Sequence, residues 1–120
     1  AAQIGCAVAA IANSLIFDAE GAPLLVLTSG AHRVDTGKLA AYLGVAKLKR
    51  ATPEFVRLHT GQVIGGVAPL GHPAPIRTLI DETLAAQGRV WAAAGHPHTV
   101  FPIDYDELLK ATGAEAVAVN

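Results

Sequence analysis

Apolar and polar residues alternate along the chain in a way that predicts several short strands. Two β-rich runs, residues 14–19 and 23–29, flank Glu20-Gly21-Ala22, and this arrangement predicts a β-hairpin. Further strand-like runs occupy residues 77–80, 89–94, 99–103 and 116–119. The chain is therefore expected to be rich in short strands.

Helical spacing of apolar residues appears in two other places. Residues 35–43 carry Leu39, Ala40 and Leu43 at helical intervals, and Gly44 suits the position just after a helix. Thr52-Pro53-Glu54 predicts a helix start, because it supplies a hydroxyl cap, a proline in the first turn and an acidic residue near the helix N-terminus. We expect this second helix to run to about residue 59.

The remaining helices are predicted near the two ends of the chain. Residues 6–13 are expected to end a short helix before the first strand. Asp104 is expected to cap a last helix, with Glu107 completing a capping box and Gly113 ending it. Strands outnumber helices and most connections are short, so the fold class is α+β, with a mixed, curved sheet in one domain over residues 1–120.

Composition narrows the classes of function. With 120 residues the chain can form one core but not two. Aromatic residues make up only 5 % of the chain, which argues against a sheet that stacks nucleic-acid bases. No apolar run approaches the roughly 20 residues that span a bilayer, and no helix-turn-helix pattern indicates DNA binding. Neither a membrane nor DNA is therefore expected as a partner.

Charge is unevenly distributed. The whole chain holds nine basic and ten acidic residues, a formal charge of −1. Residues 32–50 hold five of the nine basic residues and one of the ten acids, so this segment carries +4 and the rest −5. A local basic segment on a nearly neutral protein suits contact with a few phosphates, although a solvated helix face is an equally good interpretation. The five basic residues are Arg33, Lys38, Lys47, Lys49 and Arg50.

Cysteine usage and the first residue of the chain give two smaller expectations. Cys6 is the only cysteine, which excludes an internal disulfide and a cysteine zinc site and fits a reducing cytoplasm. We expect no cofactor and no metal. The chain starts at Ala1, and this start is expected to lie inside a helix, so a preceding segment is expected.

Chemistry could reside in a glycine-rich segment between residues 61 and 75. Its centre is Gly65-Gly66-Val67-Ala68-Pro69-Leu70-Gly71-His72. Successive N–H groups of such a segment can bind an anion or a developing oxyanion, but the lysine and hydroxyl residue of a P-loop are absent. From spacing alone, a structural turn is the more common explanation.

Two other polar spots are candidates for a site. The histidines of Gly95-His96-Pro97-His98 could act as acid and base, although exposed loop histidines are the simpler explanation and a third metal ligand is missing. Asn13-Ser14 could form a helix-to-strand turn or point into a pocket. No Ser/His/Asp arrangement can be assigned from the sequence.

The order of the motifs resembles the YbaK / prolyl-tRNA synthetase-associated editing domain family. The resemblance runs in register from about residue 5 to residue 113. Its pieces are Gly5-Cys6, residues 11–17 (IANSLIF), residues 25–30 (LVLTSG), Val34-Asp35, residues 38–40, Leu43-Gly44, residues 51–54 (ATPE), Thr60-Gly61, residues 65–72 and Leu79-Ile80-Asp81. Each piece alone is weak, but the ordered series is specific.

The resemblance implies a curved, barrel-like mixed sheet around a pocket, and hydrolysis of the ester that joins a wrong, small amino acid to the 3′ adenosine of tRNA for proline or a related tRNA. It implies a trans-editing deacylase that binds the aminoacyl-tRNA acceptor end and works alone or with prolyl-tRNA synthetase. Members usually extend further at the N-terminus. The alternative is a non-catalytic module of the same fold that binds an aminoacyl-adenosine or nucleotide.

The resemblance also implies residue roles. The family's GxxxP loop falls on Gly65 and Pro69, while a family lysine that approaches the substrate falls on Asn13, which lacks the positive charge. The residues expected to act in catalysis are Gly65, Gly66, Pro69 and His96. Those expected to bind substrate are Asn13, Ser29, Val67, Ala68, Gly71, His72, Gly95 and His98, with tRNA contacts from the five basic residues of 32–50.

Overall fold

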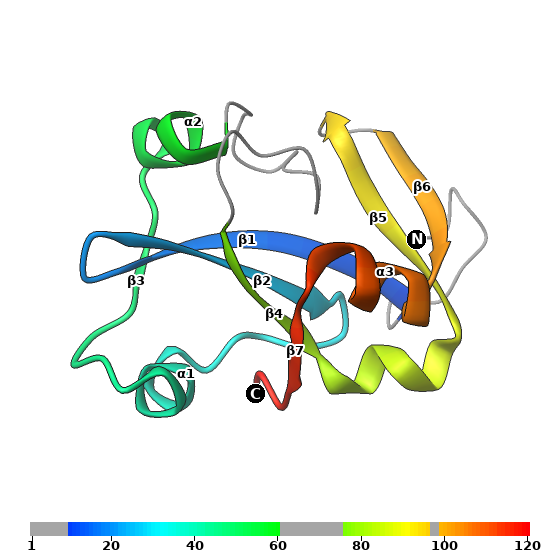
Figure 1. The fold of residues 1–120 in the computed structure, drawn as a ribbon, viewed down its shortest axis with the longest axis horizontal. Coiled ribbons are helices and arrows are strands. Elements are labelled where there is room, and N and C mark those ends of the chain that lie inside the picture. Colours follow the sequence, from blue (N-terminus) through cyan, green and yellow to red (C-terminus); the bar gives the residue numbers. More distant parts are fainter. Residues whose placement is uncertain (1–9, 61–75, 97–98) are drawn as a thin grey trace.

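A curved, mixed β-sheet forms the centre of the computed structural model, which describes residues 10–60, 76–96 and 99–120 (Figure 1). In these ranges the sheet has seven strands in the order β6-β5-β1-β2-β4-β7, with β3 beside β1. The strands are β1 Ile11–Ala19, β2 Ala22–Ser29, β3 Lys49–Arg50, β4 Arg77–Asp81, β5 Arg89–His96, β6 Thr99–Asp104 and β7 Glu115–Val117. The predicted α+β class and curved mixed sheet are confirmed.

Helices cover both faces of this sheet. They are α1 Thr36–Leu43, α2 Pro53–Thr60, α3 Tyr105–Thr112 and a 3₁₀ helix, Glu82–Gln87. Successive residues of β2 point to opposite faces, so Val26 packs into a cluster with Leu39 of α1, and Leu27 into a second cluster with Val56 of α2 and Leu108 of α3. β2 is buried from Leu24 to Ser29, and it holds the two halves of the core together.

The central hairpin is confirmed. β1 and β2 pair antiparallel from Ala12–Ser29 to Ala19–Ala22, so Glu20 and Gly21 alone form the turn. Both turn residues have positive φ, 55° and 95°, the backbone conformation that matches the twist of a two-residue hairpin. The Gly21 N–H donates to Asp18 Oδ1 at 2.6 Å, which stabilises the turn further.

The predicted helix end up to Asn13 is wrong where the structure describes it, because β1 already begins at Ile11. Alanine favours helices in isolation, but here Ala12 is buried between β2 and β5, opposite Ser29 on one side and Ala92 on the other. Tertiary packing therefore overrides the local preference.

One edge of β1 is shared by two strands. β2 occupies the other edge, while β5 runs parallel to β1 at Ile11 and Ala12 and β3 runs antiparallel to it at Phe17 and Asp18. β5 lies near the start of β1 and β3 near its hairpin end (Figure 1). The stretch of β1 between these two contacts carries Asn13 and Leu15, and the candidate site lies beside it.

All three predicted helix starts lie where expected, but only two of them have a side-chain cap. Asp35 caps α1 by accepting from the Lys38 N–H, and Thr52 Oγ1 accepts from the Phe55 N–H at the start of α2. The capping box of α3 is wrong: Asp104 occupies the cap position, but its side chain makes no capping hydrogen bond. Its Oδ1 instead lies 3.7 Å from Nε of Arg89, the residue opposite it in the β5–β6 ladder.

Two elements were missing from the sequence prediction. β3 has only two residues, too few for any alternation to show, and the 3₁₀ helix Glu82–Gln87 follows β4 directly. The glycine-rich segment 61–75 and residues 97–98 lie outside the described residues. Among the described helices, none is long and apolar enough to cross a membrane.

Candidate functional site

A pocket of about 530 Å³ opens beside β1 on the α1 side of the sheet. Its walls come from β1, from the end of β2, from the connection between β2 and α1, and from β3. The lining residues are Asn13, Leu15, Phe17, Thr28, His32, Arg33, Val34, Thr36 and Arg50. Segments far apart in the sequence thus combine apolar walls with several hydrogen-bonding groups.

The strand geometry of β1 separates the polar pair Asn13-Ser14. Asn13 shares a face with Leu15 and Phe17 and lines the pocket opposite Thr28, its partner on β2. Ser14 points the other way, and its Oγ is buried without a hydrogen-bond partner among the described residues. Of the two residues, only Asn13 belongs to this pocket.

Two arginines line the pocket near Asn13. The guanidinium of Arg50, on β3, lies 5.9 Å from the centre of the Phe17 ring, a cation–π arrangement. Arg33 follows β2 in the connection to α1. Within the described residues neither arginine has an acidic partner, and no acidic side chain lines the pocket. The pocket therefore carries a net positive charge.

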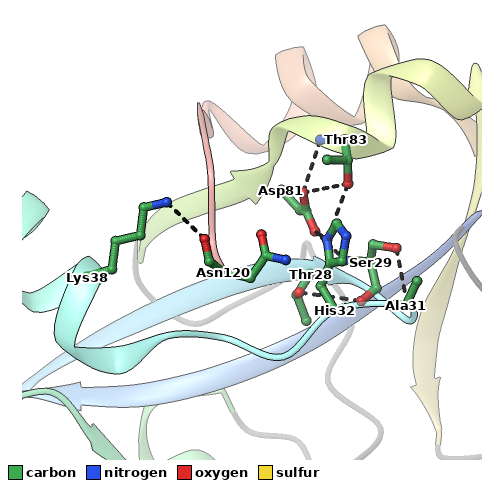
Figure 2. A network of polar contacts seen from close by, with 8 residues as sticks. All are labelled: Thr28, Ser29, Ala31, His32, Lys38, Asp81, Thr83 and Asn120. Carbon is green, nitrogen blue, oxygen red and sulfur yellow. Dashed lines mark hydrogen bonds and ion pairs between the residues drawn. The ribbon is translucent and has the colours of Figure 1, made fainter.

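A buried carboxylate fixes one wall of the pocket (Figure 2). Asp81, at the end of β4, is completely buried and accepts hydrogen bonds through both oxygens. Oδ2 accepts from the Ser29 N–H at 3.1 Å and from His32 Nδ1 at 2.8 Å. Oδ1 accepts from the N–H and the hydroxyl of Thr83, at 3.0 and 2.7 Å. Asp81 thereby joins the end of β2, the following loop and the 3₁₀ helix.

The charge state of Asp81 follows from these contacts. Burial alone raises the pKa of a carboxyl group, but the hydrogen bonds from Thr83, His32 and the Ser29 backbone favour the ionised form, and together they hold the pKa of Asp81 below its usual value. The group is therefore a carboxylate at neutral pH, and it can only accept hydrogen bonds.

His32 is oriented by this carboxylate. Since an ionised carboxylate only accepts, the proton on the 2.8 Å contact belongs to Nδ1 of the imidazole. Nε2 has no partner within the described part of the chain, and the side chain is 24 % exposed at the pocket wall. An imidazole held in this tautomer offers a lone pair on Nε2, the arrangement of a general base.

The other predicted site residues that the structure describes lie around the pocket rather than in it. Ser29 is buried at the end of β2, where its hydroxyl accepts from the Ala31 N–H and its own N–H binds Asp81. Lys38, on α1, donates through Nζ to the Asn120 carbonyl at 2.9 Å (Figure 2). Lys47 and Lys49 are exposed before and within β3, outside the pocket lining.

Other predicted site residues are not described. Gly95 and His96 end β5, but only their backbone is described. The remaining ones fall wholly outside the described residues: Gly65, Gly66, Val67, Ala68, Pro69, Gly71, His72 and His98. Among the described residues, no group of three or more His, Cys, Asp or Glu side chains is arranged to hold a metal ion.

The sequence analysis missed His32 and the role of Asp81. Forty-nine positions separate the two residues. His32 stands in no quoted motif, and Asp81 ends one piece of the family resemblance, Leu79-Ile80-Asp81, to which no role was assigned. One weak indication was available: Asp81 ends an apolar run that predicts a strand, and a carboxylate at the end of a buried strand needs polar partners. Which residue supplies them depends on the pairing of β2 with β4.

Comparisons with known proteins agree with this architecture. The family model of the aminoacyl-tRNA editing domain matches residues 1–111. A proline–tRNA ligase of Levilactobacillus brevis is 34 % identical over 74 residues, which are 62 % of this chain and 13 % of the ligase. The uncharacterised protein YwhH of Bacillus subtilis is 30 % identical over 109 residues, 90 % of this chain and 69 % of YwhH. The chain thus spans only a small part of the ligase it matches.

Solved structures give the same result. A crystal structure of a protein described as a candidate trans-editing enzyme for prolyl-tRNA synthetase superimposes with a TM-score of 0.95 at 41 % identity, covering 99 % of this chain and 75 % of that one. At this identity the likeness extends beyond the fold. The family model covers nearly the whole sequence, and the sheet is the one expected for the family. This chain belongs to the YbaK-type aminoacyl-tRNA editing domain family.

Proposed function

We propose that this protein is a trans-editing deacylase that hydrolyses a small, wrongly attached amino acid from tRNA for proline or a related tRNA. The observation that carries the proposal is the positively charged pocket at Asn13, in a chain that belongs to an editing family. The pocket combines an amide, two hydroxyl groups, an imidazole and two guanidinium groups, which suits a polar, anionic ligand such as the end of a tRNA. Translation takes place in the cytoplasm, so we expect the protein to act there.

The reaction is ester hydrolysis. A water molecule attacks the carbonyl carbon of the aminoacyl ester, and the tetrahedral oxyanion collapses to release the amino acid and the ribose hydroxyl of the adenosine. Backbone N–H groups of residues 65–68 would stabilise the oxyanion, each contributing about 3 kcal/mol to the transition state. Gly65 and Pro69 would contact the terminal adenosine and the ester, and Gly71 and His72 would bind the substrate.

A histidine would assist the attacking water. The sequence offers His96 and His98 for this role, and the structure adds His32, whose Nε2 is available while Nδ1 donates to Asp81. We favour His32 as the base, because it lines the same pocket as Asn13. The proton taken from water would then return to the leaving ribose oxygen.

Asn13 supports a second candidate function. An asparagine at the family's lysine position can hydrogen-bond a substrate but cannot attract an anion, so a module that binds an aminoacyl-adenosine without cleaving it is the alternative. The two arginines of the pocket argue for retained anion recognition in either case.

Deacylation of a panel of mischarged tRNAs distinguishes the two functions. Alanyl-, cysteinyl- and seryl-tRNA for proline are incubated with the protein, and free amino acid and the mobility shift of the tRNA are both measured. Release of one small amino acid above the rate without protein supports the deacylase. A mobility shift without release identifies the binding module. One methylene group discriminates by only about 1–3 kcal/mol, so activity on more than one substrate is expected.

The glycine-rich segment is tested by Gly65→Ala. If backbone N–H groups of this segment stabilise the oxyanion, the variant loses deacylation while its circular dichroism spectrum and thermal midpoint stay unchanged. Lys110→Gln, on the exposed side of α3, is a control that should keep the wild-type rate. An unchanged rate in Gly65→Ala would remove the segment from the mechanism.

A further inference from the structure

We propose that Arg50 and Arg33 form a phosphate-binding subsite in the Asn13 pocket, which holds the phosphate that precedes the 3′-terminal adenosine of the RNA. This inference rests on the proposed function, because it names the part of the tRNA that the pocket receives. It divides the five basic residues of 32–50 into two that act inside the pocket and three that do not. The geometry of the pocket supports this division.

Arg50 is held so that its guanidinium stays at the pocket. β3 pairs antiparallel with β1 at Phe17, and the Arg50 side chain then lies over the Phe17 ring at 5.9 Å. Phe17 is 1 % exposed, so the ring is a fixed support for a side chain that would otherwise move freely in solvent. An arginine that is positioned in advance loses less entropy when it binds an anion.

Arg33 contributes the second charge from another element. The connection that carries it is fixed at its start, where the His32 N–H donates to the Ser29 carbonyl and the His32 side chain donates to Asp81. At its end, the Asp35 N–H donates to the Val119 carbonyl at 2.7 Å. Arg33 thus stands on a loop tied to the body of the protein at both ends.

Among the described residues no acidic side chain compensates the charge of the pocket, in contrast to two other exposed arginines. Arg77 pairs with Glu115 at 3.1 Å, and Arg89 lies 3.7 Å from Asp104. In the described residues Arg33 and Arg50 have no such partner. A phosphate would supply the missing negative charge, and guanidinium groups bind phosphate oxygens through paired hydrogen bonds.

The remaining lining fits a nucleotide rather than a bare anion. Asn13 and the hydroxyl groups of Thr28 and Thr36 offer donors and acceptors for a ribose or a base edge, and Leu15 and Val34 provide apolar walls. A volume of about 530 Å³ gives room for more than a phosphate ion. By contrast, Lys38 is engaged with Asn120, and Lys47 and Lys49 do not line the pocket.

Binding measurements test the subsite without requiring turnover. Inorganic phosphate, adenosine and adenosine 5′-monophosphate are titrated into the wild-type protein, and chemical shifts and calorimetric affinities are measured. We expect the monophosphate to bind roughly tenfold more tightly than adenosine, the size of one charge-assisted hydrogen bond. Arg50→Gln and Arg33→Gln should each remove most of this difference, while Lys110→Gln on α3 should keep it.

A second experiment tests whether the subsite binds this phosphate when it is part of an RNA and not only in a free nucleotide. A microhelix ending in CCA is compared with the same RNA whose last internucleotide phosphate is a neutral methylphosphonate. Weaker binding of the neutral RNA to the wild type, with no such difference in Arg50→Gln, supports the subsite. Equal affinity of the two RNAs, or equal affinity of adenosine and its monophosphate, overturns it.

The outcomes also separate this inference from the proposed function. If the protein releases no amino acid but shows the phosphate dependence, the subsite stands and the deacylase does not. If it deacylates tRNA and Arg50→Gln binds the monophosphate as the wild type does, only the subsite is wrong. Circular dichroism of each variant confirms that a loss of binding does not come from unfolding.

Discussion

Among single residues, Asp81 allows the clearest prediction, because its charge and its contacts are both defined. Asp81→Asn keeps the size of the side chain but presents an NH₂ group to donors that need an acceptor, so we expect it to destabilise the fold by about 1–3 kcal/mol at neutral pH. Urea unfolding at pH 7 measures this. A change below a few tenths of a kcal/mol would show that the network contributes little.

The pH dependence of this contribution follows from the lowered pKa of Asp81. A group whose pKa is lower in the folded state stabilises the fold fully above its unfolded pKa, about 3.9, and loses this contribution as the pH falls through the folded value. The stability difference between wild type and Asp81→Asn should therefore be largest near neutrality and shrink below pH 4. Urea unfolding curves at pH 3 and pH 7 provide the comparison.

For His32, another single residue, the expected effect of substitution is on catalysis. If Nε2 takes the proton of the attacking water, His32→Gln should lower kcat by about 10²- to 10⁴-fold with KM nearly unchanged, and the pH–rate profile should lose one limb. His59→Gln, on α2 and outside the pocket, is the matched control. A profile of unchanged shape in His32→Gln would assign the base to another residue, such as His96.

At the scale of elements, Gly37 in α1 and Gly44 just after it allow a direct test of how glycine affects the stability of this helix. Gly44 ends the helix with φ of 74°, and nothing lies within 4 Å of an added Cβ, so Gly44→Ala should cost about 1 kcal/mol through backbone strain alone. Gly37 lies in the first turn with ordinary φ, and Gly37→Ala should stabilise by a few tenths to 1 kcal/mol. Thermal unfolding of both variants should show shifts of opposite sign.

The elements also show how far the sequence alone can be interpreted. The hairpin, α1 and α2 were predictable because Glu20-Gly21, Gly44 and Thr52 act on their immediate neighbours. The start of β1 was not, since Ala12 is a strand residue only when Ala92 lies beside it. Asp104 is the N-cap of α3 as predicted, but its side chain makes no capping hydrogen bond, and Arg89 faces it across the ladder.

The candidate site was predictable only in part. The family resemblance singled out Asn13, and the charge distribution singled out Arg33 and Arg50, all of which line one pocket. His32 and Asp81 could not be joined from the sequence, because their contact depends on how β2, β4 and the intervening loop are arranged in space.

At the scale of the whole molecule, the separation of charge predicts how RNA binding responds to salt. The segment 32–50 carries +4 and the rest of the chain −5, so positive charge is concentrated in this segment although the chain is nearly neutral. We expect the affinity for a tRNA acceptor stem to fall with salt, with a log–log slope that drops by about one for each phosphate contact removed. Lys47→Gln and Lys49→Gln, combined, should flatten this slope, and Lys110→Gln should not.

The sharing of one edge of β1 by β5 and β3 has a consequence for synthesis on the ribosome. The hairpin β1–β2 emerges early, but β2 gains its parallel neighbour only when Leu79 and Ile80 arrive, and β1 gains β5 only with Trp91 and Ala92. Until then a nascent chain leaves one edge of β2 and the start of β1 unpaired, and unpaired strand edges invite self-association. Slower translation of the last third should therefore increase the need for chaperones.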